Sequence, residues 1–373
     1  MNSAAVNSTH SLSGKPAVSF EVPVQPVKHS DYGSETEKID RVGQSAFEKI
    51  ESISHRADDL ANYSLSVITN VLIGFYTFVH TTRNVVDAVR GFFCQSRFVN
   101  DICTILSESL AYVSLGEVVS LPFSVYGIFH SIYAYCKGDI DTFELIVEGI
   151  ITNLLYIGDN IANFVCDLVK IGIDVPGVVQ WADLFGIFTL AISICCLISD
   201  ARGWHRSAKF LKEFDEAVQS ESGNSPKLVA LLRHDKKRVC EHLSLTEAEV
   251  NIIVDRVDCI GKNIFANMGT PQENGEELNR QHEEALKLLR GRVSDKILSH
   301  QLRVASNSVR IVASTLQLAT VWTPAAPFTV PIASTLYACG GTINIAEFSY
   351  RHIRNFQFRR SILLNKNFTV AQS

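Results

Sequence analysis

The sequence has no excess of positive charge and few charged residues of either sign. Its 373 residues carry a formal net charge of −5, and charged side chains make up 20% of them. The missing positive charge argues against general nucleic-acid binding, which needs a basic surface. The mean hydropathy of +0.13 is too positive for a disordered chain and too low for a densely polytopic transporter. Composition therefore indicates one or two folded domains of apolar character and no particular chemical activity.

The sequence also lacks the cysteine pattern of a disulfide-stabilised protein. It has nine cysteines, an odd number. Disulfide frameworks are typical of short secreted chains with an even set of cysteines. Most of the cysteines here lie in apolar helical runs, where a free thiol acts as a small hydrophobic side chain. We therefore expect reduced thiols that are shielded by packing or by lipid.

A secretory signal peptide is missing as well. Residues 1–40 have no charged segment followed by an apolar one; they are polar and rich in Ser, with Pro16, Pro23 and Pro26. Such a segment buries too little apolar surface to offset its ordering entropy, which predicts a disordered leader. The same composition is typical of leaders that type III secretion systems recognise.

Helical periodicity is abundant, whereas alternation of the β type is confined to Ala17–Val24. The stretch Leu60–Thr82 has no formal charge, and its apolar residues recur at helical spacing, as in Leu72, Phe75 and Val79. This pattern predicts an all-α fold built from long antiparallel helical hairpins.

Three further apolar runs follow, at Val118–Cys136, Glu144–Ile173 and Leu184–Ser199. A helix needs about 20 apolar residues to cross a hydrocarbon core of ~30 Å, so these runs are of borderline length. Acidic residues lie in and around them, and a carboxylate inside a bilayer is costly. For this stretch we therefore prefer a soluble bundle with each acid at the water-facing surface. The acids are Glu108, Glu117, Glu144, Glu148 and Asp159.

The longest uncharged run lies near the C-terminus and covers 36 residues, Ile311–Ala346. Prolines interrupt its middle, which predicts a hairpin whose turn contains Pro324, Pro327 and Pro331. Each arm has about 15 apolar residues, which is short for a full crossing. Basic residues on both flanks predict that the two ends stay on one side of a membrane and meet anionic headgroups. These flanking residues are Arg290, Arg292, Lys296, Arg303, Arg310, Arg351, Arg354, Arg359 and Arg360.

The region between the apolar parts is polar. Ser220–Pro226 has the composition of a linker, and Pro226 can begin a helix with Ser225 as its N-cap. A long amphipathic helix is expected to begin near Glu276. The sequence thus predicts a leader at 1–40, an apolar helical region with hairpins at 41–219, a polar helical insert at 220–284 and a C-terminal hairpin at 285–373.

No motif with catalytic mechanics occurs, so we predict neither an enzyme nor a cofactor. The strongest candidate for a metal site is the set His234, Cys240, His242 and Cys259, whose spacing fits no zinc finger, and we expect no metal there. Gly340-Gly341 follows no strand and precedes no lysine, so it is not a phosphate-binding loop. These glycines predict a close approach of two helices or, alternatively, a kink in the helix.

A family resemblance is carried by the Ser-rich leader, the run Ile311–Ala346 and its lead-in Leu288–His300, which reads LLRGRVSDKILSH. Paired apolar helices around a tight turn after such a leader resemble the inclusion-membrane and type III secreted effector proteins of chlamydiae. The resemblance implies an effector that resides in or on a host-derived vacuole membrane after secretion.

These patterns together predict a membrane-associated, non-enzymatic interaction or scaffold protein. Its expected partners are a bilayer with anionic headgroups and an unidentified protein, without nucleic acid, and homo-oligomers are left open. One alternative is a soluble, cytoplasmic helical bundle whose apolar helices are all core. The other is a pore-forming or translocator-like protein whose hairpins insert conditionally. An uncovered belt of apolar side chains would argue against the soluble bundle.

Overall fold

The computed structural model describes residues 71–176, 178–219, 226–234, 236–243, 245, 249–251, 253–255, 273–321 and 326–364. The predictions for the leader at 1–40, for Ala17–Val24 and for the first part of Leu60–Thr82 lie outside these residues.

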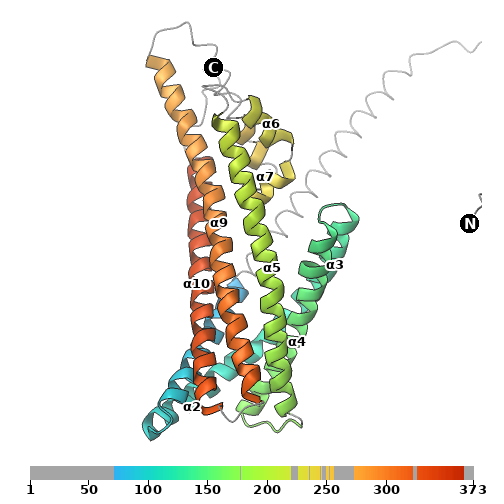
Figure 1. Cartoon of the computed structure of the whole chain (residues 1–373), viewed down its shortest axis with the longest axis vertical. Coiled ribbons are helices and arrows are strands. Elements are labelled where there is room, and N and C mark those ends of the chain that lie inside the picture. Colours follow the sequence, from blue (N-terminus) through green and yellow to red (C-terminus); the bar gives the residue numbers. More distant parts are fainter. Residues whose placement is uncertain are drawn as a thin grey trace, which may run out of the picture. The chain divides into compact units, whose positions relative to one another are not determined.

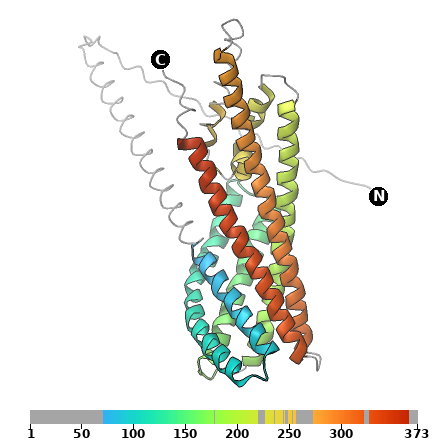
Figure 2. The same ribbon diagram turned by 90° about the vertical axis from the view of Figure 1, so that its left-hand side faces the viewer.

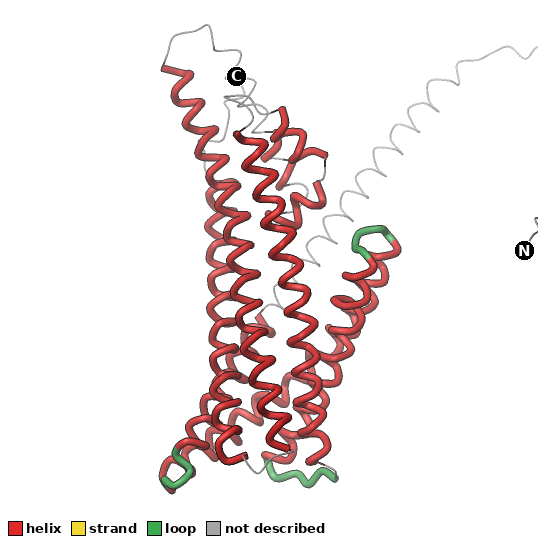
Figure 3. The backbone as a smooth tube through the Cα atoms, viewed as in Figure 1, coloured by secondary structure: helices red, strands yellow, loops and turns green. Residues whose placement is uncertain are grey.

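Within these ranges the chain is almost entirely helical and contains no strand, which confirms the all-α prediction (Figure 3). The first described helix occupies residues 71–92. The elements that follow it are α2 (Arg97–Ser114), the 3₁₀ helix η1 (Leu115–Ser120), α3 (Leu121–Cys136), the π-helix η2 (Glu144–Ile151), α4 (Thr152–Lys170), α5 (Val178–Gln219), α6 (Pro226–His234), α7 (Lys236–Leu243), α9 (Glu273–Val321) and α10 (Ala326–Leu364) (Figure 1).

Local chemistry explains several of the helix starts. The Ser96 hydroxyl accepts a hydrogen bond from the Val99 N–H at 3.4 Å and caps α2. Asp141 and Glu144 form a reciprocal capping box before η2. The Glu144 N–H donates to Asp141 Oδ1 at 2.9 Å, and the Asp141 N–H donates to Glu144 Oε2 at 3.1 Å.

The later helices begin close to where the sequence predicts. Pro226 is the first residue of α6, and α9 begins at Glu273, near the expected Glu276. The expected boundary between the polar insert and the C-terminal hairpin, at 284/285, falls inside α9. Helical spacing of apolar residues continues across that point, so the chain continues as one helix.

The two C-terminal helices run antiparallel and side by side (Figures 1 and 2). Ser306 Oγ donates a hydrogen bond to the Gly340 carbonyl at 2.8 Å, and Tyr350 Oη donates to Asp295 Oδ1 at 2.7 Å. From the first contact to the second, the residue number rises on α10 and falls on α9, as expected for two antiparallel helices. α5 also packs along α9.

The connection between α9 and α10 is shorter than the sequence predicts. Pro324 lies outside the described residues, but Pro327 and Pro331 both lie in α10, which begins at Ala326. A proline in the first turn of a helix costs nothing, because the first N–H groups have no helical partner. Pro331 lies deeper and removes one helical hydrogen bond, yet the helix continues through it.

Helix 71–92 packs closely against α10 (Figure 2). A Cβ added at Gly91 would collide with the Pro331 ring, and one added at Gly341 would collide with the Thr81 hydroxyl. Only glycine allows the two backbones to approach this closely. The close approach predicted from Gly340-Gly341 is therefore confirmed.

Most residues of the buried hydrophobic core cluster lie in 220–284, which the sequence predicts as a polar insert. The cluster is formed where α6, α7 and the described residues between 245 and 254 pack against the C-terminal halves of α5 and α10 and the N-terminal half of α9. Each of these helices buries apolar side chains, and the guanidinium of Arg292 on α9 is buried beside them over the Phe358 ring. The cluster contains Phe210, Phe214, Leu232, Val239, Leu243, Leu245, Val250, Ile253, Val254, Leu289, Val293 and Phe358.

Candidate functional site

Three helical segments among the described residues are long and apolar enough to cross a membrane. They are Arg97–Cys136, which combines α2, η1 and α3, then Glu144–Lys170, which combines η2 and α4, and Gly186–Gln219 of α5. The sequence indicated these runs but favoured a soluble bundle for them. At about 1.5 Å per residue, the shortest of them, with 27 residues, measures about 40 Å, more than a hydrocarbon core of ~30 Å.

The apolar side chains of these segments are largely uncovered. Only 22%, 17% and 22% of the residues in their most apolar windows are buried. Phe129 of α3 is 65% exposed, Leu154 of α4 is 54% exposed and Ile187 of α5 is 50% exposed. A water-soluble bundle would turn such residues into its core, as the cluster around Phe210 does. These helices therefore present an apolar outer surface, which we call the apolar belt.

The C-terminal run Ile311–Ala346, which the sequence favours as the membrane hairpin, is not one of the three segments. Both arms contact other helices, although part of their apolar surface is exposed, as at Val312 of α9 and Ile332 of α10. Gly186 of α5 lies against Leu318 of α9, and helix 71–92 covers α10 at Gly341. The apolar belt thus lies mainly on helices nearer the N-terminus than expected.

Behind the apolar belt, a buried ion pair joins helix 71–92 to α4. Arg83 Nη1 lies 2.7 Å from Asp167 Oδ1, and the Asp167 side chain is only 1% exposed. The contact has the distance of an ion pair without the geometry of a hydrogen bond. The Ser114 hydroxyl of α2 donates a hydrogen bond to the other oxygen of the same carboxylate. One carboxylate therefore connects three helices.

Two more carboxylates expected at the surface are turned inward. His80 Nε2 lies 2.8 Å from Glu117 Oε2, and the Thr189 hydroxyl donates to Asp159 Oδ1 at 3.0 Å. For these two acids the prediction of water-facing positions is wrong, because each has a polar partner on another helix. Glu108 and Glu148 are exposed, as predicted. Three acids of the segments that could cross a membrane, Glu117, Asp159 and Asp167, thus have polar partners on other helices, which lowers the cost of placing them in lipid.

A larger cluster of charges marks the end of the apolar part, and we call it the boundary cluster. Arg303 of α9 contacts both Asp200 of α5, at 3.3 Å, and Glu347 of α10, at 3.6 Å. Arg351 lies 3.4 Å from Glu347, and Asn307 donates a hydrogen bond to Asp200 at 3.1 Å. Two buried carboxylates are balanced here by two guanidinium groups, so no charge is left uncompensated.

The sequence contains a pattern from which the boundary cluster could have been predicted, namely the first charged residue after each long uncharged run. Asp200 is the first charge after the uncharged run Leu184–Ser199, and Glu347 is the first charge after Ile311–Ala346. The structure brings these two residues to one level through Arg303. The first charges after the two uncharged runs of α5 and α10 therefore lie next to each other in the structure.

Beyond the boundary cluster, α5 is tied to the start of η2. Arg202 and Arg206 both contact Asp141, the latter at 3.0 Å, and Arg206 also contacts Glu144. The pKa of Asp141 is lowered, first because the Glu144 N–H donates to its carboxylate and then because of the two arginines.

The predicted basic flanks are mostly engaged within the protein. Contacts to acids or to carbonyl and amide oxygens are made by Arg290, Arg292, Lys296, Arg303, Arg351 and Arg354. Arg310 lies against Gly340, the side chain of Arg359 lies outside the described residues, and Arg360 is exposed. Their contact with anionic headgroups stays a prediction.

Two groups near the hydrophobic core have shifted pKa values. Burial, followed by the charge of Lys296, lowers the pKa of His242 to about 4. The His242 ring stacks on Phe210 with a centroid distance of 4.7 Å, and its Nδ1 lies 3.2 Å from Ser207 Oγ. Burial lowers the pKa of Lys296 to about 8, and Lys296 Nζ donates to the Glu241 carbonyl. Within the described ranges no cluster of His, Cys, Asp or Glu could hold a metal ion; Cys259 lies outside them.

A comparison with protein-family models, with curated proteins and with solved structures finds no match to the chain.

Proposed function

We propose that this protein is a non-enzymatic scaffold that is anchored in a membrane by the apolar belt and that holds a protein partner at its polar end. The observation that carries the proposal is the inverted polarity of the two ends. Apolar side chains are exposed around Arg97–Lys170 and at Ile187–Ile198 of α5, whereas they form a buried core around Phe210 and Leu289. Each end suits a different solvent.

The boundary cluster supports an interfacial position for the middle of the molecule. Paired charges are tolerated at the edge of a bilayer, where water and headgroups reach them. Asp200, Arg303 and Glu347 would lie there, and Arg202 and Arg206 would lie just beyond, on the polar side.

The polar end is the part that we expect to meet a protein. Short amphipathic helices α6 and α7 lie on the long helices and carry exposed charged residues such as Lys236 and Glu241. The partner, and any self-association, remain part of the proposal.

A finer proposal is that the protein is a secreted effector in or on a host-derived vacuole membrane. It is supported by the Ser-rich leader and by the resemblance of Leu288–His300 and Ile311–Ala346 to chlamydial inclusion-membrane proteins. Residues 1–40 fused to a reporter enzyme test it. Export of the reporter by a type III secretion system, and loss of export in a secretion-deficient strain, are expected. Retention of the reporter in both strains refutes the finer proposal.

Alkaline carbonate extraction of membranes from cells expressing the full chain tests the anchor. We expect the protein to stay in the membrane pellet and to dissolve only in detergent. Its full release would instead support the soluble bundle. A triple variant, Phe129→Glu, Leu154→Glu and Ile187→Glu, places one acid on each candidate span at a cost of about 3 kcal/mol each for a central position, and should be released.

A matched control places three acids at exposed neutral positions of the polar end, Ala230→Glu, His234→Glu and Gln357→Glu. This variant should remain in the pellet. Equal release of the two triple variants would show that added charge, and not the apolar belt, decides membrane retention.

The inward-facing acids favour a second candidate, a conditional pore. Glu117 and Asp159 lie among helices that could line a polar path through a membrane. Dye release from liposomes on addition of the protein would support the pore. Stable incorporation without leakage would support the passive anchor.

A further inference from the structure

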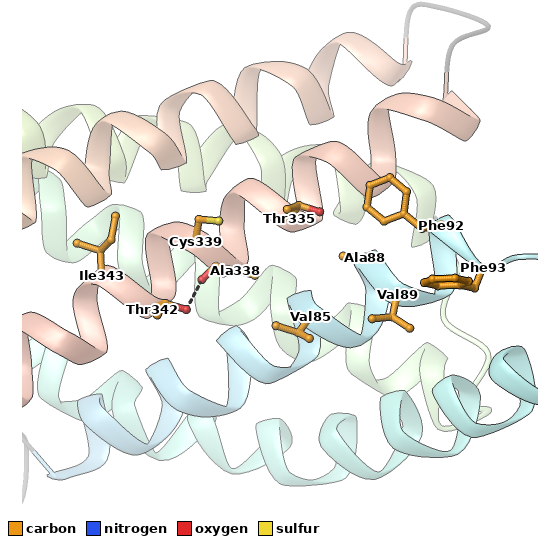
Figure 4. Close-up of a pocket in the computed structure, with 10 residues that line it drawn as sticks. All are labelled: Val85, Ala88, Val89, Phe92, Phe93, Thr335, Ala338, Cys339, Thr342 and Ile343. Atoms are coloured by element: carbon orange, nitrogen blue, oxygen red, sulfur yellow. Dashed lines mark hydrogen bonds between the residues drawn. The ribbon is translucent and has the colours of Figure 1, made fainter.

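A groove of about 610 Å³ runs between helix 71–92 and α10 (Figure 4). Helix 71–92 contributes Val85, Ala88, Val89 and the two phenylalanines Phe92 and Phe93. The opposite wall belongs to α10 and consists of Thr335, Ala338, Cys339, Thr342 and Ile343. The small residues Ala88 and Ala338 make the groove hollow, since larger side chains at these positions would fill it. The volume lies in the range of sites that hold small ligands.

The groove offers its occupant almost no polar group. The hydroxyl of Thr335 donates to the Pro331 carbonyl at 2.8 Å, and the hydroxyl of Thr342 donates to the Ala338 carbonyl at 2.8 Å, as the dashed line in Figure 4 marks. Both hydroxyls are therefore satisfied within their own helix. The remaining lining is aliphatic, aromatic or thiol, which suits a hydrocarbon chain.

One end of the groove carries positive charge. The helix ends at Phe92, and the turn that follows it leads into α2 at Arg97. Arg90 lies one turn before Phe93, and both arginines are exposed. Neither forms an ion pair with a described residue. Because two exposed arginines lie within five residues of Phe92 and Phe93, this end of the hydrocarbon groove is complementary to a lipid with an anionic headgroup.

We infer that this groove binds one acyl chain of an anionic phospholipid, whose phosphate is held by Arg90 and Arg97. The inference rests on the proposed function, because the groove meets lipid only if the apolar belt lies in a bilayer. The exposed faces of Phe92 and Phe93, 60% and 58% exposed, lie where the acyl chain joins the headgroup. Aromatic side chains are favoured at that depth of a membrane.

Photo-crosslinking of the full chain tests the inference. The protein is incorporated into phosphatidylcholine vesicles that contain a trace of phosphatidylglycerol with a photoactivatable group in its acyl chain, and crosslinked peptides are mapped by mass spectrometry. We expect crosslinks concentrated on Val85, Val89, Thr342 and Ile343. The same group on phosphatidylcholine should label these residues several-fold less.

Two pairs of variants separate the groove from its charged end. Thr342→Phe fills the groove from its exposed rim and should abolish groove labelling, whereas Ser349→Phe, two turns along the same face of α10, should not. Arg90→Gln with Arg97→Gln should weaken the preference for phosphatidylglycerol on the order of tenfold. The control removes two exposed charges of the polar end, Lys209→Gln with Lys236→Gln, and should keep the preference.

The outcomes distinguish the inference from the function on which it rests. Protein that incorporates into vesicles but crosslinks evenly over the apolar belt, with equal yields for both lipids, overturns the lipid site and leaves the membrane anchor standing. Protein that does not float with vesicles overturns both. If circular dichroism shows that Thr342→Phe does not fold, a competition experiment on the wild-type chain replaces it. Unlabelled phosphatidylglycerol should then compete with the photoactivatable lipid for labelling of the groove. Competition no stronger than that of phosphatidylcholine overturns the site.

Discussion

Removing the positive member of the Arg83–Asp167 pair should cost far more stability than removing an exposed arginine from the same helix. Arg83→Met leaves the Asp167 carboxylate, 1% exposed, with the Ser114 hydroxyl and no cation. Breaking a buried pair in this way costs about 3–5 kcal/mol, because the remaining charge is buried and uncompensated. A loss of about 3 kcal/mol corresponds to a change on the order of 100-fold in the unfolding equilibrium.

The double variant Arg83→Met with Asp167→Asn should recover most of that loss. It removes both charges, and the amide of asparagine can still accept the hydrogen bond from Ser114. The control is Arg90→Met, which removes an exposed arginine without a described ion pair and should change stability by less than about 0.5 kcal/mol.

The assay is reversible unfolding in mixed detergent micelles, followed by far-UV circular dichroism for the wild type, the two single variants, the double variant and the control. A loss for Arg83→Met no larger than that of Arg90→Met would refute the reasoning. So would a double variant whose loss equals the sum of the single losses, because the two side chains would then act independently.

Three further predictions concern packing, pH and accessibility. Gly341→Val should destabilise the protein by about 1–3 kcal/mol in the same assay, because the added side chain collides with Thr81. The control Gly291→Ala has open space around it and should be neutral or slightly stabilising. Equal effects of the two substitutions would contradict the close packing at Gly341. Because the pKa of His242 is lowered from 6.5 to about 4, the unfolded chain binds a proton in this window that the folded chain does not. The free energy of unfolding should fall by up to about 3 kcal/mol as the pH drops from 6.5 to 4, and the fall should be absent in His242→Gln in pH-dependent denaturant titrations. Cys136, at the end of α3, and Cys339, in the groove, are both exposed in the protein itself. In open membrane sheets a charged maleimide should nevertheless modify Cys136 and leave Cys339 unmodified until detergent is added. Equal labelling of the two thiols in membranes would contradict a lipid-covered groove.

The helical class and several helix starts could be predicted because they depend on local sequence. Pro226 begins a helix through its fixed backbone angle, and α9 begins where apolar residues take up helical spacing. The close approach at Gly341 was also predictable, because small residues in apolar helices allow two backbones to come close, although a helix kink was an equally local alternative.

The partners of the buried charges could not be predicted, because each pair joins distant segments. Asp200 and Asn307 lie far apart along the chain, as do Arg83 and Asp167. The location of the core was misjudged for a related reason. A helix with one apolar face has low average hydropathy yet buries that face, whereas a helix that is apolar all round can face lipid. The average hydropathy of the sequence therefore marks residues 220–284 as polar, although side chains such as Leu232 and Val239 are buried in the core.

α5 continues without a break from the apolar belt, past Asp200, to the hydrophobic core at the polar end. With 42 residues it forms a rod of about 63 Å. A rod of that length pivoting by about 10° moves its far end by about 11 Å, and helices in bilayers commonly change tilt when the thickness of the lipid changes. A partner bound at α6 and α7 would move with the far end of α5. A change in bilayer thickness would then change the position of that partner in the aqueous phase.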